Sequence, residues 1–508
     1  MTATLTQNAA PTAVRTGAGG SWAAVVALAR FEARRLLLRL PVLIAFVLHV
    51  TWIVWHTSRS SDDFPVLQDA DRATQGGPLL VGLAVLLCAN QAALRSRRRD
   101  TERHFVVLSL APWRRTAAHM LSVVVPALLT AAAVTAQFTW ETLKPGAVGR
   151  GSVAELLTGP LIVLLFGTIG VLLARLCPVA VAGPLLVVVF LMLFVGGALP
   201  FAGRETGAVW LTPVVTTSGV RPFPSDLLGR PAAWHALYLA GLALTAALLA
   251  VLVSGGRTRT VQAALAGALA LAVLGGVVQT GGVTAATAAA RTRDSLTPEK
   301  VQTCTRRGPS HYCAFPEWTP RVDDWARVAD RVQALAGGGA HERPLLVRQR
   351  VEARYDLGDA AIAPSTRPGQ VTVGTSWGGN RVPEFSTAVA GVLVADNEKN
   401  AAGLCDGRMV TVMWLSLAWQ RDPESVLRHV RLDDSLTGSA IVLSRTEPLT
   451  MTAGQTKVVR ALFRRPFDGV AARVKAHWTE LTTPKVTTAR AAELLGLHID
   501  VGADRCTG

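Results

Sequence analysis

The sequence predicts a membrane-embedded, all-α domain followed by an α+β domain exposed to water. Half of the 508 residues are hydrophobic and only 17% are charged, which excludes an ordinary soluble protein and a disordered chain. Long apolar stretches occur only within residues 1–284, whereas the chain from Arg291 onward carries 29 basic and 24 acidic residues. We therefore expect a transmembrane domain over 1–284 and an extracytoplasmic domain over 285–508.

The apolar stretches number about seven, and each has roughly the length of a membrane-crossing helix. A helix needs about 20 apolar residues to cross a hydrocarbon layer of about 30 Å. The expected spans are residues 41–56, 77–94, 118–139, 156–173, 180–199, 232–253 and 261–280.

The N-terminal segment lacks the apolar core of a secretory signal peptide, so we expect it to be retained. Residues 21–40 combine apolar residues with basic ones that gather towards their end, at Arg30, Arg34, Arg35 and Arg39. This composition predicts an amphipathic helix that lies on the membrane surface before the first span.

Charged residues between the spans predict the orientation. If the N-terminus is cytoplasmic and the sides alternate, the inner segments hold 15 basic and 3 acidic residues, and the outer segments before residue 285 hold 7 basic and 8 acidic. Cytoplasmic loops carry the excess of lysine and arginine. We expect a multi-pass protein of the cell membrane with a cytoplasmic N-terminus and an extracytoplasmic C-terminal domain. The basic charge is explained by the membrane, and no nucleic-acid partner is expected.

Four cysteines lie in the hydrophilic C-terminal part, namely Cys304, Cys313, Cys405 and Cys506. An even number of cysteines in an oxidising compartment predicts disulfides. Three pairings exist, of which Cys304 with Cys313 and Cys405 with Cys506 is the simplest. A zinc site is the weaker alternative, because eight residues separate Cys304 from Cys313, against the two to four of a zinc ribbon.

Periodicity in the C-terminal part predicts more helix than strand. Apolar residues at helical spacing predict a helix over 320–335, with further helices over 385–395, 409–419, 424–430, 455–462 and 488–497. Charged and apolar residues alternate over 347–355, which predicts a half-buried strand, and 370–373 is also strand-like.

Motifs of nucleotide hydrolysis and zinc catalysis are absent from the sequence. No G-x-x-x-x-G-K-[ST] phosphate loop occurs, so an ATP-driven action requires a partner that binds ATP. His341 and Glu342 lack the second histidine of H-E-x-x-H. We therefore expect neither a bound metal nor a cofactor.

One stretch, GTSWG at residues 374–378, matches the G-x-S-x-G motif of a serine nucleophile. A hydrolase of this type would use Ser376, with Asp433 or Asp434 as the acid and His477 or His498 as the base. The motif requires strand, turn and helix in succession, and here GGNRVP follows the serine. We interpret the match as a glycine-rich loop and expect no catalytic residue.

Three polar residues lie within the expected spans, where an unpaired polar group is costly. His49 lies towards the middle of the first span, and we expect a packed, neutral, hydrogen-bonded histidine, with a substrate or proton role as the alternative. Asn90 and Gln91 lie close to Arg95, so we expect them near the cytoplasmic interface or bonded to a neighbouring helix.

The loop between the second and third spans, residues 95–122, carries an arginine cluster, an apolar run and a break at Pro112. The arginines need no role beyond keeping the loop in the cytoplasm. The apolar run indicates docking to membrane lipid or to a protein. This run consists of Phe105, Val106, Val107, Leu108 and Leu110.

This arrangement resembles the permease subunits of type-two ABC transporters over about the first half of the chain. The entrance ALARFEARRLLLRLPVLIAFVL looks like the interfacial helix and first span of that family. The loop DTERHFVVLSLAPWRRTAAHMLS is similar to its coupling helix, and the outer loop 200–231 stands where the family has re-entrant helices. The resemblance implies that 102–110 binds a cytoplasmic ATP-binding subunit, and the residues that we assign to this coupling contact are Glu102, Phe105, Val106, Leu108 and Pro112. It also implies that two permease halves, identical or different, pair.

Two hypotheses follow for the function. The first is a permease-like membrane subunit of an ATP-driven transporter. The chain departs from the six-span plan of that family, because a seventh span, 261–280, exports a domain of more than two hundred residues. The second hypothesis is therefore a membrane anchor for an extracytoplasmic domain that binds a partner or acts as a serine hydrolase.

Overall fold

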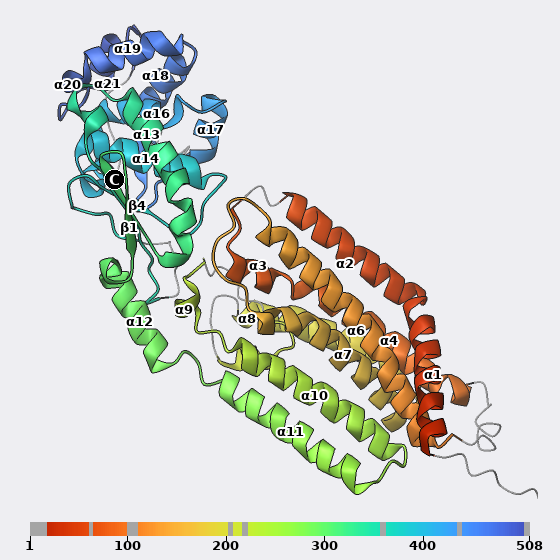
Figure 1. The fold of residues 1–508 in the computed structure, drawn as a ribbon. Coiled ribbons are helices and arrows are strands. Elements are labelled where there is room, and N and C mark those ends of the chain that lie inside the picture. The colour runs from red at the N-terminus through yellow and green to blue at the C-terminus, as the bar shows by residue number, and fades with distance from the viewer. Residues whose placement is uncertain are drawn as a thin grey trace, which may run out of the picture.

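The computed structural model describes residues 18–59, 64–98, 110–201, 207–215, 222–355, 362–433 and 439–501. Long helices form a bundle, and a smaller mixed domain lies at one end of it (Figure 1). Helix α12 (Ala285–Leu296) leads from the bundle into this domain.

The bundle consists of α1 (Ala18–Leu37), α2 (Leu40–Arg59), α4 (Gly76–Arg98), α6 (Pro112–Thr142), α7 (Val153–Leu176), α8 (Ala182–Phe201), α10 (Ala232–Val253) and α11 (Arg259–Gln279). Short helices α3 (Leu67–Ala73), η1 (Gly207–Leu211) and α9 (Ser225–Leu228) lie in its loops. In the described part of the chain, six segments, those of α2, α4, α6, α7, α10 and α11, are long and apolar enough to cross a membrane. The expected all-helical architecture of this part is thus confirmed, and six of its helical segments have the length and composition of membrane spans.

The fifth expected span coincides with α8, whose apolar segment within the described residues, Ala182–Leu193, is shorter than a span. Its start lies beside α4, because a β-carbon at Gly183 would be 2.9 Å from Oδ1 of Asn90. Beyond its end, the carbonyl oxygen of Pro213 lies 3.4 Å from Nε2 of His235, in the first turn of α10. The part of the chain that includes α8 therefore begins beside α4 and reaches the start of α10.

Glycines bring neighbouring helices of the bundle close together. A β-carbon at Gly170 of α7 would lie 2.3 Å from the carbonyl oxygen of Leu86 on α4, and one at Gly241 of α10 would lie 2.5 Å from the backbone nitrogen of Ala272 on α11. Small residues at such contacts are typical of helix pairs in membranes. The backbones of α4 and α7, and those of α10 and α11, therefore approach each other closely at these glycines.

The smaller domain, which follows α12 and is called the soluble domain, contains a four-stranded sheet. The order of its strands is β1 (Thr303–Arg307), β2 (Ser310–Ala314), β3 (Leu346–Gln349) and β4 (Gln370–Val373). Strands β1 and β2 form an antiparallel hairpin, whereas β2, β3 and β4 are parallel. Helices η3 (Pro316–Arg321) and α13 (Val322–Leu335) form the crossover from β2 to β3. A second, antiparallel sheet joins β5 (Arg431–Asp433), β6 (Ser439–Val442) and β7 (Leu449–Thr452).

The remaining helices enclose an apolar core that includes the fully buried side chains of Trp318, Trp325, Phe385 and Trp414. They are η2 (Pro298–Lys300), η4 (Gly338–Glu342), α14 (Arg381–Ala395), α15 (Glu398–Ala402), α16 (Arg408–Leu417), α17 (Pro423–Val430), α18 (Ala453–Phe463), α19 (Phe467–Ala476), α20 (Trp478–Leu481) and α21 (Thr488–Leu494). Helices α13, α14, α16, α17, α18 and α21 lie where helices were expected, to within a few residues.

The strand expected over 347–355 is wrong beyond Gln349. The main chain leaves the sheet there, and the N–H of Ala353 donates to Oγ of Ser295 on α12 over 2.9 Å. The charged residues that produced the alternating pattern pair locally instead, since Arg354 contacts the carboxylate of Glu352 over 2.6 Å. Alternation over nine residues therefore predicted a longer strand than the four-residue β3.

Candidate functional site at the junction of bundle and domain

Arg321, the last residue of η3, joins the soluble domain to the bundle. The residue is 1% exposed, and its guanidinium donates to the carbonyl oxygen of Thr375 over 3.0 Å and to that of Phe64 over 2.6 Å. It donates further to the carbonyl oxygens of Pro65 (3.2 Å) and Gly146 (3.3 Å). A buried guanidinium is tolerated only where its N–H groups find acceptors. Arg321 thus ties the loops that follow α2 and α6 to the loop that follows β4.

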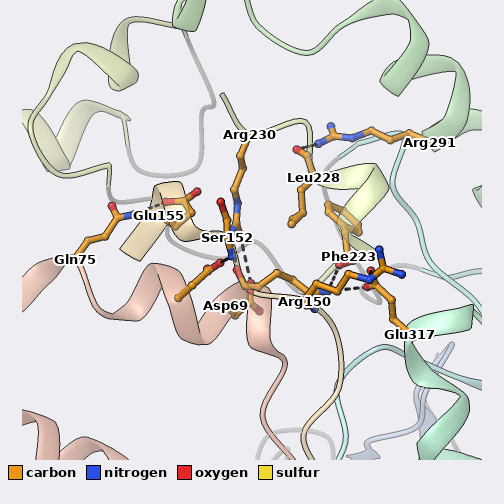
Figure 2. A network of polar contacts seen from close by, with 12 residues as sticks. Asp69, Gln75, Arg150, Ser152, Glu155, Phe223, Leu228, Arg230, Arg291 and Glu317 are labelled. Atoms are coloured by element: carbon orange, nitrogen blue, oxygen red, sulfur yellow. Dashed lines mark hydrogen bonds and ion pairs between the residues drawn. The ribbon is translucent and has the colours of Figure 1, made fainter. Parts of the chain in front are cut away.

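Gln68 of α3 forms the second link. Its Nε2 donates to the carbonyl oxygen of Phe223 over 2.7 Å and to Oε2 of Glu317 over 3.4 Å, and its Oε1 accepts from the N–H of Arg150 over 3.2 Å. Figure 2 shows Phe223, Glu317 and Arg150 converging at this point. The Glu317 carboxylate also accepts from the N–H of Ser225 over 3.1 Å. One buried amide therefore connects three bundle loops with η3.

Two more arginines close the junction around α9. Arg230 donates to the carbonyl oxygen of Gln68 over 2.6 Å and lies 3.4 Å from Oδ1 of Asp69. Arg291 of α12 donates to the carbonyl oxygens of Leu227 (2.7 Å) and Leu228 (2.9 Å) (Figure 2). Because most acceptors are main-chain carbonyls, these contacts fix the positions of whole loops.

The junction holds a first cavity of about 320 Å³. Its polar side chains come from the bundle and from the loop after β4, and they include His56, Asp69, Gln137, Glu141 and Ser376. Apolar groups of Phe64, Val66 and Trp377 complete the wall. The cavity has the mixed lining typical of a small-molecule or peptide binding site.

The surroundings of Ser376 differ in part from the expectation. Strand β4 ends at Val373 and α14 begins at Arg381, so a helix does follow the turn after a short connection. Pro383 lies in the first turn of that helix, where the missing N–H is tolerated. The acid and base named for a hydrolase are not brought to the serine: Asp433, His477 and His498 do not line the first cavity, and Asp434 lies outside the described residues.

A second cavity, of about 390 Å³, lies under α9 and is lined by acidic and basic residues of the same loops. Asp71 and Glu155 on its wall are 1% and 4% exposed. Oδ2 of Asp71 accepts from the N–H of Ser152 over 2.8 Å, and the amide of Gln75 donates to Glu155 (Figure 2). Two carboxylates are thus buried together where the bundle meets the soluble domain.

The polar residues of the spans are packed between helices. Asn90 is fully buried and its Nδ2 donates to the carbonyl oxygen of Gly170 on α7 over 3.1 Å, a bond to a neighbouring helix. Gln91 is half-buried. His49 is 2% exposed and lies against Gly77, but its ring nitrogens have no hydrogen-bond partner among the described residues. The hydrogen bond expected for His49 is therefore not found among the described residues.

Four of the five residues assigned to the coupling contact, Glu102, Phe105, Val106 and Leu108, lie outside the described residues. Pro112 is the first residue of α6, a position that suits proline because its missing N–H would be unbonded in any case. Near this end of the bundle, Arg95 of α4 pairs with Glu32 of α1 over 3.1 Å. The pair holds α1 against α4.

The disulfide between Cys304 and Cys313 is confirmed, and it crosses the β1–β2 hairpin. Cys405 is also disulfide-bonded, and its expected partner Cys506 lies outside the described residues. The two cysteines of the bundle, Cys88 and Cys177, are free thiols. Within the described ranges, no group of three or more histidine, cysteine, aspartate or glutamate side chains is placed to hold a metal ion.

The residues that build the junction, above all Gln68, Arg230 and Arg321, were not found by sequence reasoning. Each is a single polar residue in or beside a loop, and none belongs to a motif. No family model, no curated protein and no solved structure matches this chain. The fold and the junction therefore define the class: a helical protein with six helices long and apolar enough to cross a membrane, which carries an α+β domain at one end of its bundle.

Proposed function

We propose that this chain is the permease-like membrane subunit of an ATP-driven transporter and works with a separate, cytoplasmic ATP-binding subunit. The observation that carries the proposal is the course of α6. This helix has 31 residues and begins at Pro112, directly after the loop assigned to coupling. At 1.5 Å per residue it is about 46 Å long. Just beyond its other end, the carbonyl oxygen of Gly146 accepts from Arg321.

One continuous helix thus links the proposed coupling loop with the base of the soluble domain. A displacement of the inner end of α6 by an ATP-binding partner would be carried to Arg321, because a packed helix moves as a rigid body. The soluble domain would follow through the carbonyls of Thr375 and Phe64, which bind the same guanidinium. This supports a domain that receives or releases substrate in step with the bundle.

The orientation belongs to the proposal: N-terminus in the cytoplasm, soluble domain outside. Two observations support it. The cystine Cys304–Cys313 lies in the soluble domain, whereas the bundle cysteines are free, as expected if only the former meets an oxidising compartment. The 20-residue α8, counted with the six long apolar segments, would give seven crossings, and an odd number puts the segments before α2 and after α11 on opposite sides.

Labelling with a membrane-impermeant maleimide tests this orientation. In a chain with Cys88→Ala and Cys177→Ala, a cysteine from Asp468→Cys in the soluble domain is expected to react in intact cells. A cysteine from Arg257→Cys, in the turn between α10 and α11, is expected to react only after the membrane is opened. The reverse pattern would contradict the orientation.

Purification in mild detergent from native membranes tests the partner. The wild type is expected to bring a stoichiometric ATP-binding protein and ATP hydrolysis with it. Charged residues at the apolar run, Phe105→Glu and Leu108→Glu, are expected to abolish both. Arg257→Gln, in an exposed turn at the same end of the bundle, is the matched control and should retain the partner. A wild type that binds no ATP-binding protein would overturn the proposal.

A second candidate function rests on the first cavity. Ser376 lines this cavity together with the bundle residues His56 and Asp69. In this version the membrane part anchors a binding or serine-hydrolase domain. A labelled fluorophosphonate separates the two kinds of activity. Labelling of the wild type but not of Ser376→Ala would support a hydrolase, whereas equal labelling of both would exclude Ser376 as the nucleophile.

A further inference from the structure

Three buried oxygen atoms at the outer end of the bundle have no hydrogen-bond partner in the described part of the chain. They are Oδ1 of Asp71 in α3, Oε1 of Gln75 before α4 and Oε1 of Glu155 in the first turn of α7. The three residues are 1%, 3% and 4% exposed, respectively. Buried polar atoms are almost always paired, so three unpaired oxygens at one place require an explanation.

The contacts of these side chains leave one oxygen of each free. Asp71 uses Oδ2 to accept from the N–H of Ser152, and Glu155 uses Oε2 to accept from the amide of Gln75. Figure 2 shows Gln75 and Glu155 directed at each other, with Ser152 beside them. Ser152, which Asp71 binds, directly precedes α7, and Glu155 lies in the first turn of the same helix. The three side chains therefore meet at the start of α7.

One basic side chain, Arg230, acts on the charge of Asp71 without forming an ion pair with it. Neither Asp71 nor Glu155 forms an ion pair with a described lysine or arginine. Arg230 lines the same cavity, but it binds the carbonyl oxygen of Gln68 and pairs with Asp69. Arg150 is largely exposed and pairs with Glu317 at 3.8 Å. Buried carboxyl groups in proteins are paired, bound to a metal ion or protonated, and here no ion pair is formed with a described lysine or arginine.

We propose that Asp71, Gln75 and Glu155, which meet at the start of α7, bind a calcium ion at the base of the soluble domain. All three ligands are oxygens, two of them from carboxylates, which is the donor set of a hard cation. Calcium takes six to eight oxygens in flexible geometry, and the adjoining cavity of about 390 Å³ has room for the waters that would complete the shell. Zinc is disfavoured because the cluster offers neither nitrogen nor sulfur.

The ion would join three separate segments: α3, the turn before α4 and the start of α7. Gln68 and Asp69, which hold Phe223, Glu317 and Arg230, lie on the same short helix α3 as Asp71. Bound calcium would therefore hold the base on which the soluble domain rests. The site does not depend on the proposed transport function, because it requires only these buried ligands.

Calcium titration of the full-length protein in detergent, after treatment with a chelator, tests the proposal. The wild type is expected to show a saturable rise of its thermal midpoint and binding of one calcium per chain, with a Kd of about 10⁻⁴–10⁻³ M as in extracellular calcium modules. Magnesium chloride at equal ionic strength should give less than half of the rise. Glu155→Gln and Asp71→Asn are each expected to raise the Kd at least tenfold.

The control is Asp226→Asn, which removes an exposed carboxylate on the wall of the same cavity and should leave the Kd unchanged. In the absence of calcium, Glu155→Gln should melt at or above the wild-type midpoint, because it removes one of two buried charges. A variant that is folded by this criterion but insensitive to calcium supports the site. Absence of saturable binding by the wild type, or an equal loss in Asp226→Asn, would overturn it.

Discussion

Nη2 of Arg321 donates to the carbonyl oxygen of Phe64 over 2.6 Å, although 257 positions separate the two residues. The bond joins the soluble domain to the loop that follows α2. The same guanidinium binds Thr375 in the domain and Gly146 after α6. One side chain thus fixes the domain relative to two helices, and any movement of those helices changes the position of the domain.

Arg321→Lys is expected to loosen this junction. Lysine keeps the charge, but its single ammonium cannot reach carbonyls on both sides as the planar guanidinium does. Bonds of a charged group are worth about 1.5–3 kcal/mol each, so we expect a loss of about 3 kcal/mol and faster hydrogen exchange in residues 64–67 and 374–377. Arg327→Lys, on the exposed face of α13, is the control. Equal exchange in the two variants would show that Arg321 does not hold the junction.

Loss of the disulfide in the hairpin is expected to destabilise the soluble domain. The bridge Cys304–Cys313 closes a loop of nine residues in sequence separation, for which chain entropy predicts about 2.5 kcal/mol. The double variant Cys304→Ser with Cys313→Ser should therefore show a lower midpoint of thermal unfolding. Cys177→Ala removes a free thiol of the bundle and should leave the free energy of unfolding within about 0.5 kcal/mol of wild type. A midpoint unchanged by the double variant would contradict this role.

Glu398 is expected to give the soluble domain a specific pH dependence. Its buried carboxylate accepts from the N–H groups of Ser365 (2.8 Å) and Thr372 (2.5 Å) and from the Thr372 hydroxyl (2.9 Å). Burial raises the pKa of Glu398 above its usual value, and these bonds together with the charge of Arg350 lower it only in part. The contribution of Glu398 to stability is complete below about pH 4.3, the unfolded pKa, and is lost as the pH rises through the higher folded pKa.

Glu398→Gln should remove this dependence, because an amide does not titrate. We expect the variant to lose less stability than the wild type between pH 4 and pH 8, measured by chemical unfolding at several pH values. Glu447→Gln, in a surface pair with Lys399, should keep the wild-type slope. Parallel curves for wild type and Glu398→Gln would show that the pKa of Glu398 is not raised on folding.

The parts of the fold that the sequence predicts are those with a local signal. A run of about twenty apolar residues is enough by itself to predict a long helix, so the long helices of the bundle could be predicted. The helix α13 follows from the spacing of Val322, Trp325, Val328 and Val332, and the near pairing of Cys304 with Cys313 follows from their separation. In each case the information lies within a few turns of chain.

The junction could not be predicted for two physical reasons. Its acceptors, such as the carbonyls of Phe64, Gly146 and Thr375, belong to the main chain and are independent of residue type. Its donors, Gln68 and Arg321, lie far from these acceptors in sequence. The cluster of Asp71, Gln75 and Glu155 was missed in the same way, because its members come from three segments and no one spacing brings them together.

The close approach of α4 and α7 gives a last prediction. A β-carbon at Gly170 would lie 2.3 Å from the carbonyl oxygen of Leu86. This oxygen belongs to the main chain and cannot rotate away. The carbonyl oxygen of Gly170 also accepts the hydrogen bond from Asn90. Gly170→Ala must therefore separate the two helices, at a cost of about 1–3 kcal/mol. Gly267→Ala on α11 is the matched control, because nothing lies within 4 Å of its β-carbon; alanine should leave stability unchanged or raise it by up to about 1 kcal/mol. Thermal unfolding of both variants in one detergent gives the comparison, and a Gly170→Ala protein as stable as the control would mean that α4 and α7 are not in contact along this line.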